Sequence, residues 1–129
     1  MKGPSRELQT LKAEFFRALA HPIRIRLLEV LVTVPECSVQ DLQRTLHIAQ
    51  PIVSQQLARL RAGGIVVASK SGTATLYAVT DPLLKDLLHT AKQILNRQLV
   101  GAGSLLRELK RDRAVLPPDR HERYRLTRK

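Results

Sequence analysis

The sequence predicts a mainly α fold with a single β-hairpin, and three observations lead to it. Apolar residues recur at helical spacing through residues 5–62 and again through residues 83–95. Between them, residues 65–79 carry two short strand-like runs around a turn sequence. The length of 129 residues suits one domain with a modest core. Because aromatic residues make up only 3% of the chain, Leu, Ile and Val must build the interior.

Two helices open the chain. Residues 5–20 carry an apolar stripe wide enough to be buried on more than one side, against the chain's own core and a partner. His21 and Pro22 separate this helix from the next, because a residue before proline disfavours the α conformation and proline suits the first helical position. Residues 22–33 then form the second helix. We expect it to bury Ile23, Leu27, Leu28 and Leu31 and to leave Arg24 and Arg26 exposed.

Residues 38–62 predict two short helices that meet at a tight corner. Ser38 is the expected N-cap of the first helix, residues 47–49 form the corner, and the glycines at 63–64 stop the second helix because glycine can take a left-handed φ. Pro51 supplies the fixed φ favoured in a first helical turn. The apolar positions are Val39, Leu42 and Leu46 in the first helix, Ile48 at the corner, and Val53, Leu57 and Leu60 in the second helix.

The second corner helix has a polar flank opposite its leucines. A rotation of 100° per residue identifies the side chains of this flank, and none of them is acidic. It consists of Pro51, Gln55 and Ala58, with Ser54 and Arg59 at its edges. Gln can bond adenine, Ser can bond bases or phosphate, and Arg can pair with guanine or phosphate, so the flank suits a DNA major groove. A solvated helix in an all-α domain fits the local pattern equally well.

A hairpin follows the glycines. Residues 65–69 and 74–79 are the predicted strands, and residues 70–73 have turn chemistry. Thr80 is then expected to cap a long leucine-rich helix with Pro82 in its first turn. The resulting order is three helices, a corner, a fourth helix, a hairpin and a last helix. This is the order of a winged helix-turn-helix. In that fold the second corner helix enters the groove and the hairpin lies over the flanking backbone.

The C-terminal part differs in composition from the rest. The pattern divides the chain into a winged helix-turn-helix DNA-binding domain over residues 1–100 and a basic extension over residues 101–129. Residues 101–103 are expected to interrupt the last long helix, and a short basic helix is expected to start at Ser104. Residues 97–129 contain ten Lys or Arg against four Asp or Glu, a net charge of +6.

The charge of the whole chain is +11 and its pI is about 10.9. Such a charge favours a polyanion, with nucleic acid first and an anionic membrane second, although charge alone gives no sequence specificity. No stretch approaches the ~18 apolar residues of a membrane span, and the N-terminus lacks the apolar core of a signal peptide. The single cysteine permits no intrachain disulfide, so we expect a cytoplasmic protein without membrane contact.

Three segments resemble a known family. They are FFRALAHPIRIRLLEVL (15–31), SVQDLQRTLHIAQPIVSQQLARLRAGGIV (38–66) and KSGTATLYAVT (70–80). Together they resemble the ArsR-type, or ArsR/SmtB-like, winged helix-turn-helix transcriptional repressors of bacteria. The resemblance implies a homodimer paired through the first and last long helices. It also implies an imperfectly palindromic operator in double-stranded DNA and release by an inducer. Family positions that touch bases or adjacent phosphates fall on Gln50, Pro51, Ser54 and Gln55.

The chain departs from the family pattern at two of these positions and at the residue before them. Family members usually have Ser where this chain has Ala49 and Pro51, and His where it has Gln55. The missing cap at Ala49 costs ~1 kcal/mol of helix stability. Gln in place of His alters the preferred base, so no operator follows by analogy.

Neither family metal site has its ligands here. Ser38 and Gln40 stand at the usual thiolate positions of one site. In the other site Asp81 is kept, but Leu83, Ile94 and Arg97 replace the remaining ligands. Asp86 and His89 form a weaker candidate pair on the last long helix. We therefore expect no metal and no cofactor.

Cys37 is a candidate thiol switch, because a helix N-terminus nearby lowers the pKa of a thiol. The alternative is a small core or surface residue.

No nucleophile–base pair, paired carboxylates or phosphate-binding glycine loop stands out, so an enzyme is not expected. The leading prediction is a dimeric, sequence-specific transcriptional repressor with an unidentified inducer. In it Gln50, Ser54 and Gln55 read bases, and Arg59 and Lys70 bind phosphate. The alternatives are a winged-helix protein-interaction module, or a non-specific nucleoid-type binder driven by the basic extension. A weaker one is an anionic-membrane contact by residues 105–113.

Overall fold

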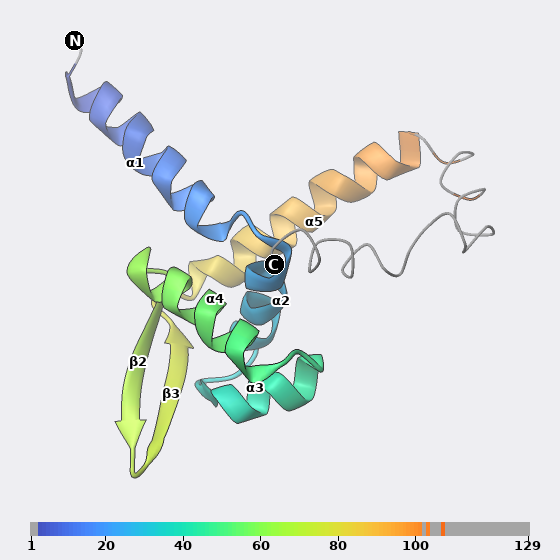
Figure 1. The fold of residues 1–129 in the computed structure, drawn as a ribbon. Helices are drawn as coiled ribbons and strands as arrows, with labels where there is room; N and C mark the ends of the chain where they lie inside the picture. The colour runs from blue at the N-terminus through green and yellow to red at the C-terminus, as the bar shows by residue number, and fades with distance from the viewer. Residues whose placement is uncertain (1–2, 102, 104–106, 108–129) are drawn as a thin grey trace. The chain divides into compact units, whose positions relative to one another are not determined.

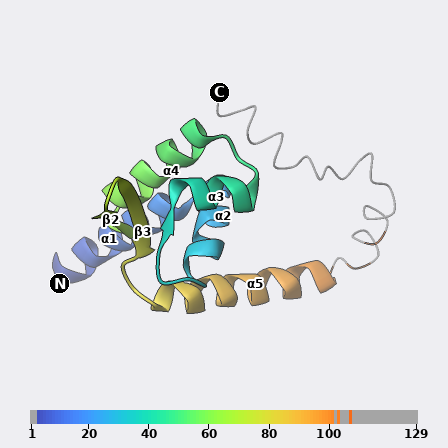
Figure 2. The same cartoon turned by 90° about the horizontal axis from the view of Figure 1, so that it is seen from below.

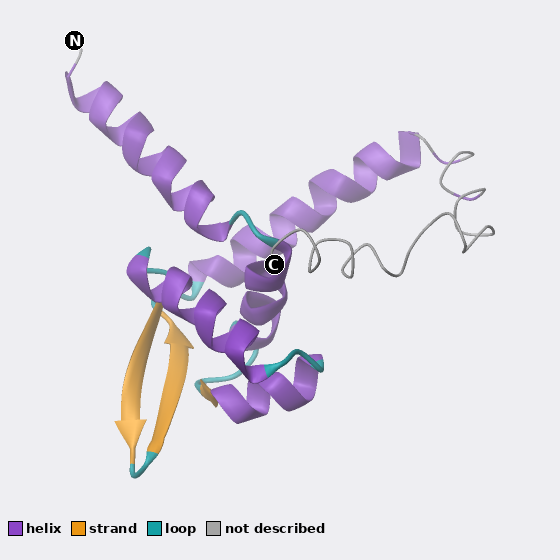
Figure 3. Cartoon of the chain, viewed as in Figure 1, coloured by secondary structure: helices purple, strands orange, loops and turns teal. Residues whose placement is uncertain are grey.

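The computed structural model describes residues 3–101, together with residues 103 and 107. Figures 1 and 3 show its helices and strands. In chain order they are α1 (Gly3–Leu19), α2 (Pro22–Leu31), β1 (Cys37–Ser38), α3 (Val39–Leu46), α4 (Gln50–Ala62), β2 (Val66–Ser71), β3 (Ala74–Val79) and α5 (Leu83–Gly101). The predicted order of elements is confirmed, with β1 added to it. The chain divides into two compact units after Lys85, so the first turn of α5 belongs to the first unit and the rest to the second.

The core of the first unit lies where α2, α3 and α4 pack on one another (Figure 2). Its fully buried side chains are Ile23, Leu27, Leu28, Leu31, Leu42, Val53, Leu57, Leu60, Ile65 and Val66. The leucines expected inside α2 and α4 are therefore buried, while Val39 and Leu46 of α3 are only half-buried. As the composition requires, the core is aliphatic.

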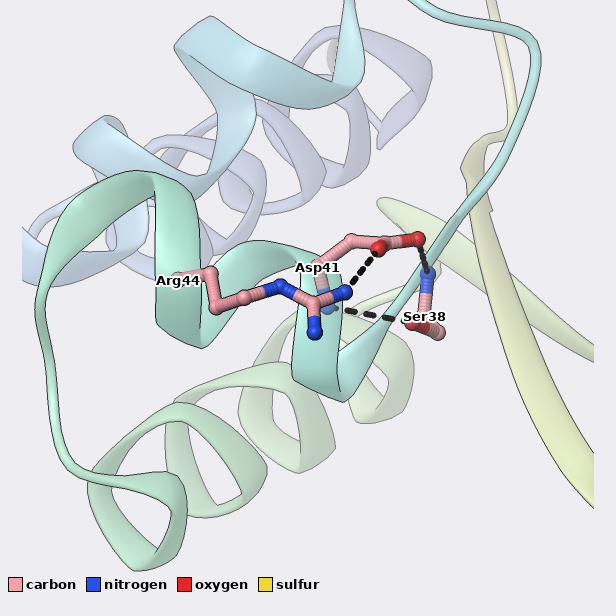
Figure 4. A network of polar contacts seen from close by, with 3 residues as sticks. All are labelled: Ser38, Asp41 and Arg44. Atoms are coloured by element: carbon pink, nitrogen blue, oxygen red, sulfur yellow. Dashed lines mark hydrogen bonds and ion pairs between the residues drawn. The ribbon is translucent and has the colours of Figure 1, made fainter.

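Side-chain caps begin α2 and α3, and the cap at Ser38 confirms the prediction. The Ile23 N–H donates to His21 Nδ1 at 3.0 Å, and Pro22 follows at the first helical position. At α3 the capping is reciprocal (Figure 4): the Asp41 N–H donates to Ser38 Oγ at 3.1 Å, and the Ser38 N–H donates to Asp41 Oδ2 at 3.4 Å. Arg44 Nη2 completes the network on Asp41 Oδ1 at 2.9 Å.

The corner between α3 and α4 is formed as the sequence predicts. His47 has a left-handed backbone with φ 56°, and its N–H donates to the Gln43 carbonyl at 2.8 Å, which closes α3. Ile48 then turns inward and is 3% exposed. The corner is therefore held by one closing hydrogen bond and one buried isoleucine.

The two glycines after α4 have different roles. Gly64 has φ +75°, the left-handed conformation expected of a helix stop. Gly63 has φ −84°, so it needs no such freedom. A Cβ at Gly63 would lie 2.7 Å from the Cβ of Ala18, so glycine here allows α1 to approach the end of α4 closely.

The sheet has three strands rather than the two predicted. Its order is β1-β3-β2, all antiparallel, with Cys37 opposite Tyr77 and Ser38 opposite Leu76. The hairpin turn is also tighter than residues 70–73, because Ser71 pairs with Ala74 and only two residues remain between the strands. Gly72, the first of them, has φ +62°, as such a turn requires. The short strand β1 joins the start of α3 to the hairpin.

The start of α5 differs from the prediction. The Thr80 hydroxyl donates to the carbonyls of Gly64 and Ile65 at 2.9 and 3.0 Å, so it fastens the end of the hairpin instead of capping the helix. Asp81 is the residue whose carboxylate accepts the Leu83 N–H, at 2.9 Å. Leu84 is buried in the first unit.

The rest of α5 belongs to the second unit. From residue 89 to residue 100 its side chains are all exposed, the leucines included. Gly101, the first residue of the predicted interruption, is still helical. The predicted short helix from Ser104 and the charged tail lie outside the described residues. None of the described helices combines the length and apolarity needed to cross a membrane.

Candidate nucleic-acid interface

Packing leaves the polar flank of α4 accessible. Val53, Leu57 and Leu60 are 0% exposed and hold the helix against the core. On the opposite flank Pro51, Gln55, Ala58 and Arg59 are exposed and Ser54 is half-buried. Gln50, the first residue of the helix, is exposed as well. The flank selected by helical spacing is thus the one that a ligand of the first unit can reach.

The N-terminus of α4 carries no side-chain cap, as predicted. Ala49 accepts the Ile52 and Val53 N–H groups through its carbonyl at 3.0 and 3.1 Å, and no side chain among the described residues caps this end. Pro51 has no N–H to satisfy. This end of the helix therefore keeps its partial positive charge without an acidic or hydroxyl partner, and such an end favours an anion nearby.

Basic residues are present along the rest of α4 and on the hairpin. Arg59 and Arg61 lie exposed in the last turn of α4, which contains no acidic residue. Lys70 is exposed on β2, opposite Thr75 on β3. The hairpin projects beyond the helices of the first unit (Figure 3). Lys70 is therefore on a strand and not in the turn, close to the hairpin tip.

The two arginines of α2 are not free surface charges, so that prediction is wrong. Arg26 is half-buried, and its Nη2 donates to the Leu46 carbonyl at 3.0 Å, at the end of α3. Arg24 is also half-buried, and its Nη1 donates to Gln56 Oε1 at 3.1 Å. Both arginines join α2 to the corner helices.

Gln56 is a residue that the sequence reasoning missed. It is 4% exposed and lies within the apolar stripe of α4, three residues after Val53 and four before Leu60. An amide at such a position needs a buried partner, and this requirement was the available signal. Burial lowers the pKa of Arg24, and the nearby Arg59 guanidinium lowers it further.

Cys37 does not have the lowered pKa that its place before α3 suggested. Its side chain is 7% exposed in β1, opposite Tyr77. Burial raises the pKa of the thiol, and the Asp41 carboxylate raises it further. The helix-end argument was wrong because burial and a nearby acid act in the opposite direction.

The candidate metal ligands are dispersed. Asp86 and His89 are exposed on the second unit, and the Asp81 carboxylate accepts a hydrogen bond at the start of α5. Within the part of the chain that the structure describes, no three His, Cys, Asp or Glu side chains are placed to hold one ion. The exposed charged groups of α4 and of the hairpin are instead Arg59, Arg61 and Lys70.

Comparisons with known sequences point in one direction. Residues 21–67 match the family model described as bacterial regulatory protein, arsR family. The HTH-type transcriptional regulator Rv0081 of Mycobacterium tuberculosis is 39% identical over 106 residues, which cover 82% of this chain and 93% of the relative. The HTH-type transcriptional repressor SmtB of the same organism is 41% identical over 78 residues, which cover 60% of this chain and 57% of that protein.

Solved structures agree with the sequence relatives. The crystal structure of Rv0081 superposes with a TM-score of 0.66 at 42% identity, covering 74% of this chain and 95% of that one. The crystal structure of the transcriptional repressor BigR from Xylella fastidiosa superposes with a TM-score of 0.62 at 32% identity, covering 73% and 96%. The predicted fold class is confirmed by these likenesses.

Proposed function

Since this chain belongs to the arsR family of bacterial regulatory proteins, we propose that it is a dimeric, sequence-specific DNA-binding repressor that an inducer releases. Its family and relatives are transcriptional regulators and not enzymes.

The observation that carries the proposal is the exposed, acid-free flank of α4. Ser54 and Gln55 in this flank, together with Gln50 at the start of the helix, offer amide and hydroxyl groups of the kinds that bond base edges in a major groove. Pro51 lies among them, against bases or the adjacent backbone. Arg59 on α4 and Lys70 on the hairpin are suited to phosphate.

Exposed apolar side chains support a dimer. On α1, Leu8, Leu11 and Phe16 are 51%, 61% and 55% exposed, and on α5 a second set of large apolar side chains is also exposed. The second set is Ile94, Leu95, Leu99 and Val100. Exposed apolar stripes of this kind mark association surfaces. Pairing of two copies through α1 and α5 gives a two-fold protein, and such a protein binds an inverted, imperfectly palindromic site.

We propose an inducer other than a metal held at the family's usual sites. Ser38, at one usual thiolate position, caps α3 through its hydroxyl, and Asp81, the one kept residue of the other site, caps α5. Neither position then offers a free ligand without loss of a helix cap.

Selection of bound duplexes from a random pool by the full chain tests the proposal. Enrichment of a site with two inverted half-sites, bound by two copies of the chain, is the expected result. A pool that stays random after repeated selection contradicts sequence-specific binding. Two copies that still pair after Leu11→Glu and Ile94→Glu contradict the proposed dimer surface.

The basic C-terminal extension keeps a second candidate open. Residues 97–129, which include this extension, carry a net charge of +6, and this charge favours a non-specific nucleoid-type binder. A winged-helix module whose partner is another protein is a further alternative. Deletion of residues 104–129 separates these from the repressor. A repressor loses general affinity but keeps its site preference, whereas a non-specific binder loses DNA binding altogether. A protein-interaction module shows no dependence of partner binding on DNA.

A further inference from the structure

The contact between α2 and α4 contains a positive charge that no carboxylate offsets. Arg24 Nη1 donates to Gln56 Oε1 at 3.1 Å, and Nη2 reaches the Ala20 carbonyl at 3.5 Å. Among the described residues no Asp or Glu forms an ion pair with Arg24. Its Nε is buried and has no hydrogen-bond partner in the described part of the chain. Fixing a guanidinium in this way is unfavourable, because it is partly removed from water without an opposite charge.

Gln56 determines where this charge lies. Its side chain is almost fully buried, and it accepts the Arg24 guanidinium from the α4 side of the contact. Arg59 stands three residues further along α4, so its side chain emerges next to that of Gln56 on the helix surface. The repulsion between the two guanidinium groups lowers the pKa of Arg24, after the larger effect of burial. A fixed cation therefore stands beside an exposed one.

Repulsion of this kind has a directional effect on Arg59. Conformers that fold the Arg59 side chain back toward α2 approach the fixed charge and are disfavoured, whereas conformers that extend into solvent are not. A phosphate that binds Arg59 is in addition attracted by the second cation behind it. Because Arg24 is half-buried, salt screens this attraction less than it screens an exposed pair.

We propose that Arg24, oriented by Gln56, is a positioning residue of the DNA interface that holds Arg59 extended toward the phosphate backbone. Arg24 itself does not touch DNA. The inference rests on the proposed function only in taking DNA as the polyanion that Arg59 meets. It assigns to α2 a contribution to affinity for any duplex, whatever its sequence.

A double-mutant cycle in the full chain tests the inference. Arg24→Met removes the charge and keeps the aliphatic stem, and Arg59→Ala removes its neighbour. Binding is measured on a duplex selected by the wild-type chain and on the unselected pool. Alone, Arg24→Met is expected to weaken binding to both by about three- to tenfold. In the Arg59→Ala background, Arg24→Met is expected to lower the logarithm of the binding constant by less than half as much.

Arg26→Met is the matched control. It removes the neighbouring half-buried arginine of α2 and its hydrogen bond to Leu46, but Arg26 has no described interaction with Arg59. Any loss it causes is expected to be the same with and without Arg59. If Arg24→Met and Arg26→Met behave alike in this respect, Arg24 acts only through folding and the inference is wrong.

Two further results keep the test decisive. If Arg24→Met does not fold, Gln56→Leu replaces it in the cycle, because this change frees the guanidinium from its acceptor and leaves an apolar side chain in the buried stripe. The same dependence on Arg59 supports the inference, and equal losses in both backgrounds overturn it. If the wild-type chain selects no sequence, the proposed function is contradicted. The double-mutant cycle on the unselected pool then still shows whether the effect of Arg24→Met on DNA affinity depends on Arg59.

Discussion

Ser38 and Asp41 hydrogen-bond each other's backbone N–H groups across the first turn of α3, at 3.1 and 3.4 Å. Ser38 is also the second residue of β1 and pairs with Leu76 of the hairpin. One residue thus ends a strand and begins a helix. The start of α3 is consequently stabilised both by hydrogen bonds within its first turn and by pairing with the hairpin.

The Asp41 carboxylate should make stability depend on pH. Its hydrogen bonds, first to Ser38 and then to Arg44, lower its pKa below the ordinary value of 3.8. Because the folded-state pKa lies below that of the unfolded chain, the stabilisation is complete above about 3.8 and is lost as the pH falls through the lowered value. Thermal unfolding of wild type and Asp41→Asn should therefore converge toward low pH. A difference in Tm that stays constant from neutral pH to strong acid contradicts this.

Gln55 should contribute to specificity more than to general affinity. Gln55→Ala is expected to lose ~1–3 kcal/mol on the best selected site and little on random DNA, since a base contact counts only where the right base is present. Titrations on both duplexes measure the difference. Gln93→Ala, an exposed Gln on α5 outside the proposed interface, is the matched control. Equal losses on both duplexes for Gln55→Ala argue against its place in the groove.

Lys70 should behave in the opposite way. Lys70→Ala is expected to weaken binding to selected and random duplexes alike and to reduce the slope of log K against log salt by about one, because one phosphate contact is lost. The slope is read from titrations at several salt concentrations. Lys85→Ala removes an exposed lysine at the start of α5 and should leave the slope nearly unchanged. An unchanged slope for Lys70→Ala would show that the hairpin lies away from the DNA phosphate backbone.

Local pattern was sufficient for much of the fold and for the exposed flank. The 3.6-residue period fixes which side of α4 is dry once Val53 and Leu57 are apolar, so Gln55 was assigned to the outer face correctly. Ile48 and the cap at His21 also follow from adjacent residues alone. Each of these features depends on neighbours within about one helical turn.

The features that were missed depend on distant partners. β1 exists only because β3 pairs with it, and two residues carry no strand pattern of their own. Thr80 and Asp81 are both capping residues, and the choice between them is made by the distant Gly64 carbonyl, which takes the Thr80 hydroxyl. The partners of Arg24 and the burial of Cys37 are set in the same way by tertiary packing.

Cys37 should be an unreactive thiol in the folded chain. Burial raises its pKa above the ordinary value of 9.0, so the thiolate fraction at neutral pH falls below that of an exposed cysteine. Alkylation by iodoacetamide is expected to be slow at pH 8, to rise only above pH 9, and to reach the rate of a model thiol in denaturant. Alkylation in the native chain at or above the model rate contradicts the burial and revives a thiol switch.

Gly64 should be the glycine whose backbone conformation matters. Gly64→Ala places a Cβ in open space but forces a non-glycine residue to φ +75°, with an expected cost of about 1 kcal/mol in the free energy of unfolding. Urea denaturation measures it. Gly72 in the hairpin turn has φ +62° and also faces open space, so Gly72→Ala is expected to have a similar cost and serves as the comparison. No loss at Gly64 shows that the end of α4 relaxes to another conformation.

The close approach of Ala18 to Gly63 has an evolutionary consequence. Because a new Cβ at Gly63 would lie 2.7 Å from the Ala18 Cβ, Gly63 cannot accept a side chain while Ala18 keeps its present size and the helices keep their spacing. The two sites, 45 residues apart in the sequence, should therefore vary together among descendants of this chain. A side chain at residue 63 is expected only where residue 18 becomes smaller, as in an Ala18→Gly, Gly63→Ala exchange.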